Sequence, residues 1–316
     1  MAIPREYATS NPQVRDALAM IPLPAGVRIG DFVAPDYPVE AEVVDSVVVG
    51  EHKLDLDDLR APDAEAKSVR FETGSSSTIS IVERALKTTM DSRKIEEAGA
   101  RGVDLIAQRL DMLRADIMDA KEYRIAQAVL AAASYGATHK VAATNFRTAD
   151  LYSTFEAAQE VIVADGNYPA EYALFGRTAW KHMRTNAEFN KFVAGPTIKS
   201  GARDLTLERA AEYLGLKEVR VGDFRRNIGG TVTQFWTTDS VLLFSRQATV
   251  STRTLAVTPV CPYGQYQNVA EGTLVDARTS KLSGTDELLE VGAYHRYISL
   301  LRNANLGFLW TGVVGV

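Results

Sequence analysis

The pattern of hydrophobic and polar positions divides the chain into five consecutive stretches, of which the first two are extended. Residues 1–40 contain six prolines and no periodic apolar pattern. Because proline removes a backbone donor and disfavours helix before it, we expect an extended arm without a core of its own. In residues 41–90, the β-branched or alternating runs AEVVDSVVV and STISIVERAL flank the polar stretch HKLDLDDLRAPDAEAK. This arrangement predicts a long β-hairpin that projects from the body.

The third stretch, residues 91–145, changes to helical spacing. It has no proline between Asp91 and Ser134, and its apolar residues recur at steps of three and four. They are Val103, Ile106, Leu110, Leu113, Ile117 and Ala120. A one-sided stripe of this kind predicts a single amphipathic helix that closes at Gly136. At about 1.5 Å per residue, the helix would reach roughly 60 Å.

The fourth and fifth stretches mix short elements. Residues 146–252 alternate between predicted helices at 149–164, 178–184 and 207–214 and predicted strands at 172–175, 219–221, 232–236 and 241–244. Thr148 and Thr206 are the expected N-caps of two of the helices, and Gly215 is the expected C-terminal residue of the last. Residues 253–316 return to strand, at 273–277, at 288–291 and in the runs YHRYISLL and NANLGFLWTGVV.

Composition and charge narrow the function classes. The 40 acidic and 35 basic residues give a net charge of −5, and no run of lysine and arginine indicates tight binding of nucleic acid. No apolar run approaches the roughly 18–20 residues needed to cross a bilayer, and the N-terminus lacks the apolar core of a signal peptide. We therefore expect a soluble, mildly acidic protein made inside the cell. The single cysteine, Cys261, excludes an internal disulfide.

The residues that carry chemistry form no recognisable constellation. The four histidines, His52, His139, His182 and His295, show no metal-ligand spacing. GSSST at 74–78 is neither a nucleophile elbow nor a phosphate loop, and Gly229–Gly230 indicates a turn. The acidic residues Asp55, Asp57 and Asp58 lie in the polar stretch and are interpreted as a solvated loop. We predict no catalytic, cofactor-binding or metal site, and we interpret Cys261 and His182 as bystanders.

The order of the parts, and five local sequences within them, resemble the major capsid proteins of tailed bacteriophages, which have the Hong Kong 97-like fold. VRIGDFVAPDYPVEAEV resembles the family's arm leading into the first strand, and ISIVERALKTTMDSRKIEEAG its return strand entering the spine helix. YALFGRTAWKHM, LTLERAAEYLGLKEVRVGD and QFWTTDSVLLF resemble consecutive pieces of its axial domain. The resemblance covers nearly the whole chain in order.

This resemblance implies an α+β fold with five parts. They are an N-terminal arm (1–40), an extended β-hairpin loop (41–90), the spine helix with the first part of a peripheral domain (91–145), an axial domain (146–252) and the second part of the peripheral domain (253–316). Within the axial domain, Leu174 and Phe175 would be core strand residues, and Trp180 and Met183 would share the buried face of a helix. Lys181 and Arg184 would face solvent or a neighbouring subunit.

The resemblance also implies a function. The chain would be a structural protein of the virion, made in the host bacterial cytoplasm, that assembles as hexamers and pentamers into an icosahedral shell around double-stranded DNA. Its partners would be other copies of itself, a portal, a cement or decoration protein and the enclosed DNA, contacted non-specifically. Because the arm begins within a few residues of Met1, we expect the scaffold to be a separate protein. No isopeptide cross-link is predicted between Lys53 or Lys67 and Asn303 or Asn305.

Two other functions fit the sequence. An encapsulin-type compartment would share the fold but enclose a protein cargo rather than DNA. An α/β enzyme with an unrecognised site would show a deep polar pocket holding a titratable group with a perturbed pKa.

Overall fold

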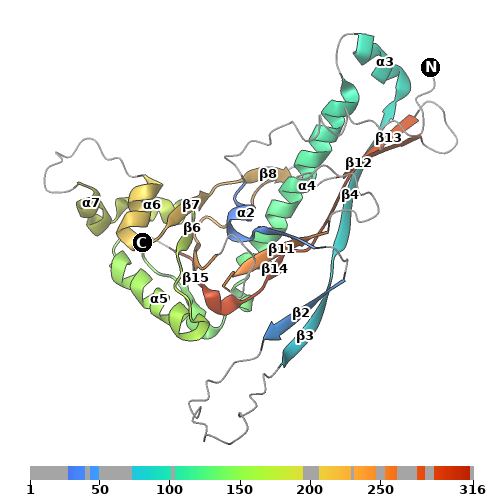
Figure 1. Ribbon diagram of the computed structural model, residues 1–316. Coiled ribbons are helices and arrows are strands. Elements are labelled where there is room, and N and C mark those ends of the chain that lie inside the picture. Colours follow the sequence, from blue (N-terminus) through green and yellow to red (C-terminus); the bar gives the residue numbers. More distant parts are fainter. Residues whose placement is uncertain are drawn as a thin grey trace, which may run out of the picture.

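The computed structural model describes residues 28–39, 43–49, 73–100, 104–194, 206–228, 231–246, 253–261, 276–281 and 288–313. The chain is α+β, as predicted, and is organised around two separate sheets with α4 and the strand β4 running out to one side (Figure 1). A projecting hairpin, β2 with β3, lies beyond the end of β4.

The larger sheet has six strands and is built around β13. Its members are β1 (Asp36–Pro38), β4 (Val82–Asp91), β11 (Ala256–Val260), β12 (Asp276–Lys281), β13 (Leu288–Tyr297) and β14 (Leu300–Leu301). β13 pairs antiparallel with β12 on one edge and with β4 on the other, from Leu288 opposite Asp91 to Tyr297 opposite Val82. Strands about 200 residues apart in sequence thus form one sheet that supports the helix following β4.

That helix region differs from the prediction of one helix between Asp91 and Ser134. The structure has α3 (Ser92–Ala100) and α4 (Leu105–Val129). Asp104 has an extended backbone, and its side chain accepts a hydrogen bond from the Ala107 N–H, so α4 begins with its own N-cap. α4 ends at Val129, well before Gly136, and its 25 residues span about 37 Å.

The apolar stripe of α4 faces the larger sheet. Leu110, Leu113 and Ile117 are buried against Met90 and Val291, which confirms these three positions of the predicted stripe. Two short 3₁₀ turns, η1 (Ala132–Ser134) and η2 (Ala137–His139), then lead into the second sheet.

The second sheet has five strands in the order β5 (Lys140–Ala142), β15 (Gly307–Thr311), β10 (Val241–Phe244), β6 (Tyr172–Gly176) and β7 (Glu218–Gly222). β10 runs antiparallel to both neighbours, whereas β7 and β5 are parallel to theirs. β15, near the C-terminus, lies beside β10 rather than in the larger sheet, with η3 (Ala304–Leu306) leading into it.

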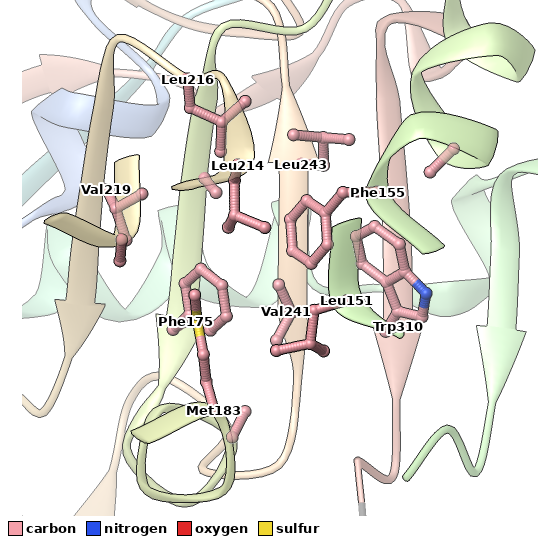
Figure 2. Close-up of a cluster of buried hydrophobic side chains, with 14 of the residues drawn as sticks. Leu151, Phe155, Phe175, Met183, Leu214, Leu216, Val219, Val241, Leu243 and Trp310 are labelled. Atoms are coloured by element: carbon pink, nitrogen blue, oxygen red, sulfur yellow. The ribbon is translucent and has the colours of Figure 1, made fainter. Parts of the chain in front are cut away.

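Helices cover the second sheet and enclose its core. They are α5 (Leu151–Gly166), α6 (Arg177–Thr185), α7 (Ala187–Ala194) and α8 (Leu207–Leu214). Figure 2 shows Phe155 of α5 between Phe175 of β6 and Trp310 of β15; the ring centroids are 6.0 and 4.8 Å apart. These stacked rings join three elements from distant parts of the sequence.

Several local predictions in this region are confirmed and one is wrong. Thr206 caps α8 by accepting from the Arg209 N–H, and Gly215 closes it with a left-handed φ of +66°. α5, however, is capped by Asp150, not by Thr148, because the Asp150 carboxylate accepts from the Ser153 N–H. Met183 is fully buried, and Trp180 packs edge-on against Phe175, as expected for one helix face.

Two hairpins stand apart from the sheets. β2 (Val43–Val49) pairs antiparallel with β3 (Thr73–Ser80), which confirms the hairpin predicted within residues 41–90. β8 (Arg225–Ile228) pairs with β9 (Thr231–Gln234), with Ile228 opposite Thr231. Between them lies Gly229–Gly230, the predicted turn, which is outside the described residues, as is the whole polar stretch at 52–67.

Candidate functional site: the α4 socket and the projecting hairpin

The polar residues of α4 form a buried socket for residues 28–39, here called the root segment. The root segment contains a short helix, α2 (Gly30–Val33), followed by β1. The sequence grouped residues 28–39 with an extended arm, but Phe32, Val33 and Ala34 are buried against the body of the same chain. The expectation of an extended arm therefore has to be corrected for the root segment, which contains a helix and packs on the body.

Glu122 is the centre of this α4 socket. Its two carboxylate oxygens accept hydrogen bonds from the backbone N–H groups of Ile29 (2.8 Å) and Gly30 (2.7 Å) and from the indole N–H of Trp236 (2.7 Å). Two of these donors belong to the start of α2, which has no side-chain cap of its own. Burial raises the pKa of Glu122, and the three hydrogen bonds offset only part of that effect.

Gly30 and Gly222 allow the close approach that this geometry requires. A Cβ on Gly30 would lie 2.5 Å from a carboxylate oxygen of Glu122. A Cβ on Gly222, in β7, would lie 2.6 Å from Trp236 and 3.2 Å from Ile29. Only residues without a side chain therefore let the root segment, Trp236 and β7 meet at this point.

Lys121 holds the other end of the root segment. Only 1% of the residue is exposed, and its ammonium lies 2.9 Å from Asp31 and 2.7 Å from Asp36. Burial works against its charge, but the two carboxylates together outweigh that cost, so the pKa of Lys121 is raised. Burial also raises the pKa of Asp36, although Lys121 opposes that shift. Breaking this pair would leave an uncompensated charge in the interior.

A third contact links the socket to the β8–β9 hairpin. Asp119 of α4 accepts from the Arg28 guanidinium at 2.7 Å and also pairs with Arg226 of β8, which contacts Asp116 as well. Arg28 additionally donates to the Ala115 carbonyl oxygen. Asp119 of α4 therefore connects Arg28, the first residue of the root segment, to Arg226 of β8.

Aromatic contacts of Phe32 also hold α2 against the body of the chain. The Phe32 ring packs edge-on against Tyr172 and Phe244, with centroids 5.7 and 5.5 Å away. The Arg220 guanidinium lies 4.4 Å from the Phe32 ring centroid, and Arg246 donates to the Phe32 carbonyl oxygen. The second sheet and α4 thus both contribute to holding one four-residue helix.

The sequence analysis did not predict the α4 socket, although the position of Lys121 in the helix pointed to it. Lys121 lies four residues after Ile117 and four before Ile125, both of which are buried. A charged residue inside an apolar stripe indicates a buried partner of opposite charge. The partners themselves, Asp31 and Asp36, are about 90 residues away and no local pattern points to them.

The projecting hairpin is the second candidate site. β2 and β3 form a two-stranded sheet that shares no ladder with the other described strands. In β4, which continues from it, Val82 and Leu86 are 44% and 39% exposed. Strand alternation places both on the same face as Met90, which is covered by α4. Val82 and Leu86 are therefore exposed apolar side chains on the same face of β4 as Arg84 and Thr88.

The three histidines that the structure describes do not meet at a common site. His139 is buried, with its ring nitrogens 2.9 Å from the Gly307 carbonyl oxygen and 2.9 Å from Asp165. His182 is half-buried on α6, and His52 lies outside the described residues. His295 is buried in β13 beside the Tyr297 ring, and neither of its nitrogens has a hydrogen-bond partner among the described residues. Burial and then the charge of Lys121 lower the pKa of His295 to about 3.

The remaining candidates are either buried singly or lie outside the described part of the chain. Cys261 is buried. Among the described ranges, no three histidine, cysteine or acidic residues are grouped closely enough to hold a metal ion, and no helix is both long and apolar enough to span a membrane. Asp55, Asp57, Asp58, Lys53 and Lys67 fall outside those ranges. Asn303 accepts a hydrogen bond from the Asn305 N–H at the start of η3. Because Lys53 and Lys67 are not described, the absence of a cross-link stays a prediction.

Comparison with known proteins places this geometry in a family. The model of the family described as phage major capsid protein E matches residues 59–272, more than half of the chain. Among curated proteins, none matches the sequence significantly.

Solved structures share the fold at low sequence identity. A phage-related protein from Bordetella bronchiseptica superposes with a TM-score of 0.67 at 19% identity, over 95% of this chain and 96% of that one. A putative capsid protein of an Escherichia coli prophage gives 0.58 at 12% identity, over 99% and 100%. The capsid protein of cyanophage P-SCSP1u gives 0.58 at 12% identity, over 93% and 91%. The fold is therefore the Hong Kong 97-like fold, and the resemblance found in the sequence is confirmed.

Proposed function

The chain belongs to the phage major capsid protein E family, and from this premise we propose that it builds the shell of a tailed phage head. In this proposal, copies of the chain assemble as hexamers and pentamers into an icosahedral shell that encloses double-stranded DNA. The protein is then a structural component of the virion, made in the cytoplasm of the host bacterium, and has no catalytic role.

The observation that carries this proposal is the β2–β3 hairpin. A two-stranded hairpin on its own is marginally stable in water, and this one shares no ladder with the other described strands. The apolar side chains of Val82 and Leu86 lie open on the strand that leads from it. Another copy of the chain supplies the missing contacts, because identical subunits around a symmetric shell repeat the same complementary surfaces.

The parts of the chain take separate roles in this shell. We assign residues 41–90 to an extended loop, 91–145 and 253–316 to a peripheral domain built on the larger sheet, and 146–252 to an axial domain built on the second sheet. β5 (Lys140–Ala142) and β15 (Gly307–Thr311) lie outside residues 146–252 but belong to the second sheet. We therefore add these two strands to the axial domain. Residues 1–40 form the arm, whose root segment is fixed in the α4 socket.

The shell has further partners in this proposal. They are a portal, a separate scaffolding protein, a cement or decoration protein and the enclosed DNA. The acidic net charge of −5 favours loose, non-specific contact with the genome, because tight phosphate binding needs an excess of lysine and arginine. No membrane partner is proposed.

Sedimentation of the expressed chain tests the proposal. The chain would be produced alone and together with the products of its neighbouring genes, and each lysate would be fractionated on a sucrose gradient. We expect particles of many copies that contain DNA when packaging proteins are present. A chain that stays a monomer or dimer under every condition would contradict the proposal, and particles filled with a protein cargo would favour a compartment of the encapsulin type.

A further inference from the structure

A cleft lies directly beside the point where the root segment begins. It has a volume of about 590 Å³ and is bounded by α8, by β7 and by the first residues of the root segment. Its apolar lining comes from Leu207 and Ala211 of α8, from Val219 and Val221 of β7 and from Ile29. Cavities of about 300–1,000 Å³ accommodate ligands the size of a few amino-acid residues.

The charged residues at this cleft are largely neutralised by their own partners. Lys217 pairs with Glu171 at 2.7 Å, Arg220 pairs with Glu218 at 2.6 Å, and Arg28 pairs with Asp119 at 2.6 Å. No cationic side chain that lines the cleft is therefore left to attract an anion. This lining favours an uncharged, apolar occupant over a phosphate, a nucleic acid or an acidic peptide.

One edge of β7 adds backbone groups to the cleft. β7 pairs with β6 along one side, and no other described strand pairs with it. An edge strand presents unpaired N–H and C=O groups that an extended segment alongside it can satisfy. The cleft therefore combines an apolar floor with a strand edge.

The chain carries a matching segment at the right place. Residues 17–27, ALAMIPLPAGV, are the eleven residues that directly precede Arg28, and none of them is charged or polar in its side chain. Pro22 and Pro24 favour an extended conformation and remove two N–H donors that burial would otherwise leave unsatisfied. Arg28 and Ile29, which line the cleft, are fixed by Asp119 and Glu122, so this segment starts at the cleft itself.

We propose that the uncharged segment at residues 17–27 of the same chain docks at the cleft between α8 and β7, with a few of its apolar side chains inside the cleft. With this binding, the part of the N-terminal region held by the body begins before Arg28. The longest uncharged stretch near the N-terminus then packs on its own chain. The part of the arm left to contact a neighbouring copy is then residues 1–16, MAIPREYATSNPQVRD, which carry all the charges that precede Arg28. The inference concerns a contact within one chain and holds whether or not the chain builds a shell.

Disulfide trapping tests this proposal directly. In a Cys261→Ala background, Leu23→Cys would be combined with Glu208→Cys on the rim of the cleft, and in a second protein with Lys217→Cys on the same rim. The matched control combines Leu23→Cys with Lys94→Cys, an exposed position on the distant helix α3. Losing the exposed Lys217–Glu171 pair has little effect on folding, because solvent-exposed ion pairs contribute little to stability.

The proteins would be oxidised at low concentration as an equal mixture of ¹⁵N-labelled and unlabelled chains, and the linked peptides identified by mass spectrometry. We expect the two cleft pairs to form disulfides within one chain at least about tenfold faster than the control. Equal rates for cleft and control pairs would overturn the proposal. Linked peptides that combine labelled with unlabelled halves would overturn it as well, by assigning the cleft to the arm of a second copy.

Discussion

At the scale of single residues, one carboxylate joins three distant parts of the chain. Glu122 accepts from Ile29, Gly30 and Trp236 inside the protein. In Glu122→Gln an amide N–H₂ group replaces one oxygen, so at least one buried donor faces another donor. We expect the free energy of unfolding to fall by about 2–3 kcal/mol, measured by urea denaturation of the unassembled chain.

The control for this variant is Glu160→Gln, which makes the same chemical change at an exposed position of α5. Its free energy of unfolding should stay within about 0.5 kcal/mol of that of the unmodified protein, as is general for surface substitutions. Equal midpoints for the two variants would show that the α4 socket contributes nothing to holding the root segment.

His295 makes a prediction about pH. Its pKa is lowered to about 3, first by burial and then by Lys121, whereas in the unfolded chain a histidine titrates near 6.5. Below pH 6.5 the unfolded chain therefore binds a proton that the folded chain does not, and stability is lost as the pH falls from 6.5 towards 3. Relative to His295→Phe, the protein should lose up to about 1.4 kcal/mol per pH unit in this range.

Unfolding curves of both proteins at pH 7, 6, 5 and 4 measure this difference. Glu122 and Asp36, whose raised pKa values act in the opposite direction, are present in both proteins and cancel in the comparison. Curves that run parallel from pH 7 to pH 4 would mean that His295 accepts a proton in the folded state as readily as in the unfolded one.

At the scale of elements, two glycines have opposite roles in helices. Gly215 ends α8 with a φ of +66°, and a Cβ there would meet no atom within 4 Å. Gly99 lies inside α3 in equally open space. Gly215→Ala should therefore destabilise the chain by about 1 kcal/mol through backbone strain alone, whereas Gly99→Ala should stabilise it by up to about 1 kcal/mol. Thermal unfolding of the two variants checks the opposite signs, and shifts in the same direction would contradict the account.

Local elements could be predicted where their signals are local. The cap at Thr206, the closing Gly215 and the strand Val241–Phe244 each depend on neighbouring residues, and the structure has all three. The long helix was predicted too long, because no proline interrupts residues 91–134 and the N-cap at Asp104 was not recognised as the start of a second helix. Caps are hard to locate from sequence where two cap-forming residues stand close together, as Thr148 and Asp150 do before α5.

At the scale of the whole molecule, the order of elements was sufficient to identify the fold but not the α4 socket. Each contact of the socket joins α4 to residues at least 85 positions away in sequence, such as Lys121 with Asp36. Hydrophobic periodicity describes which face of an element is buried, not which distant segment covers it. For that reason residues 28–39 were grouped with the arm although they belong structurally to the body.

The face of β4 that carries Val82 and Leu86 makes a prediction about assembly. Val82→Ser with Leu86→Ser removes the exposed apolar side chains of that face without touching the core. We expect the yield of sedimenting particles to fall at least about tenfold, while the thermal stability of the unassembled chain changes little, because the lost burial occurs only between copies. Ala85→Ser with Thr89→Ser, on the opposite face of the same strand, is the matched control. An unchanged particle yield for the Val82 and Leu86 variant would exclude this face from the shell contacts.

The central claim is that each copy anchors its root segment in its own α4 socket and completes its projecting hairpin on a neighbour. A cryo-electron microscopy reconstruction of purified particles tests it most directly. The account predicts a closed shell of fivefold and sixfold clusters in which the β2–β3 hairpin of each copy lies against an adjacent copy. A shell in which the hairpin folds back on its own chain, or a preparation that contains only single copies, would contradict it.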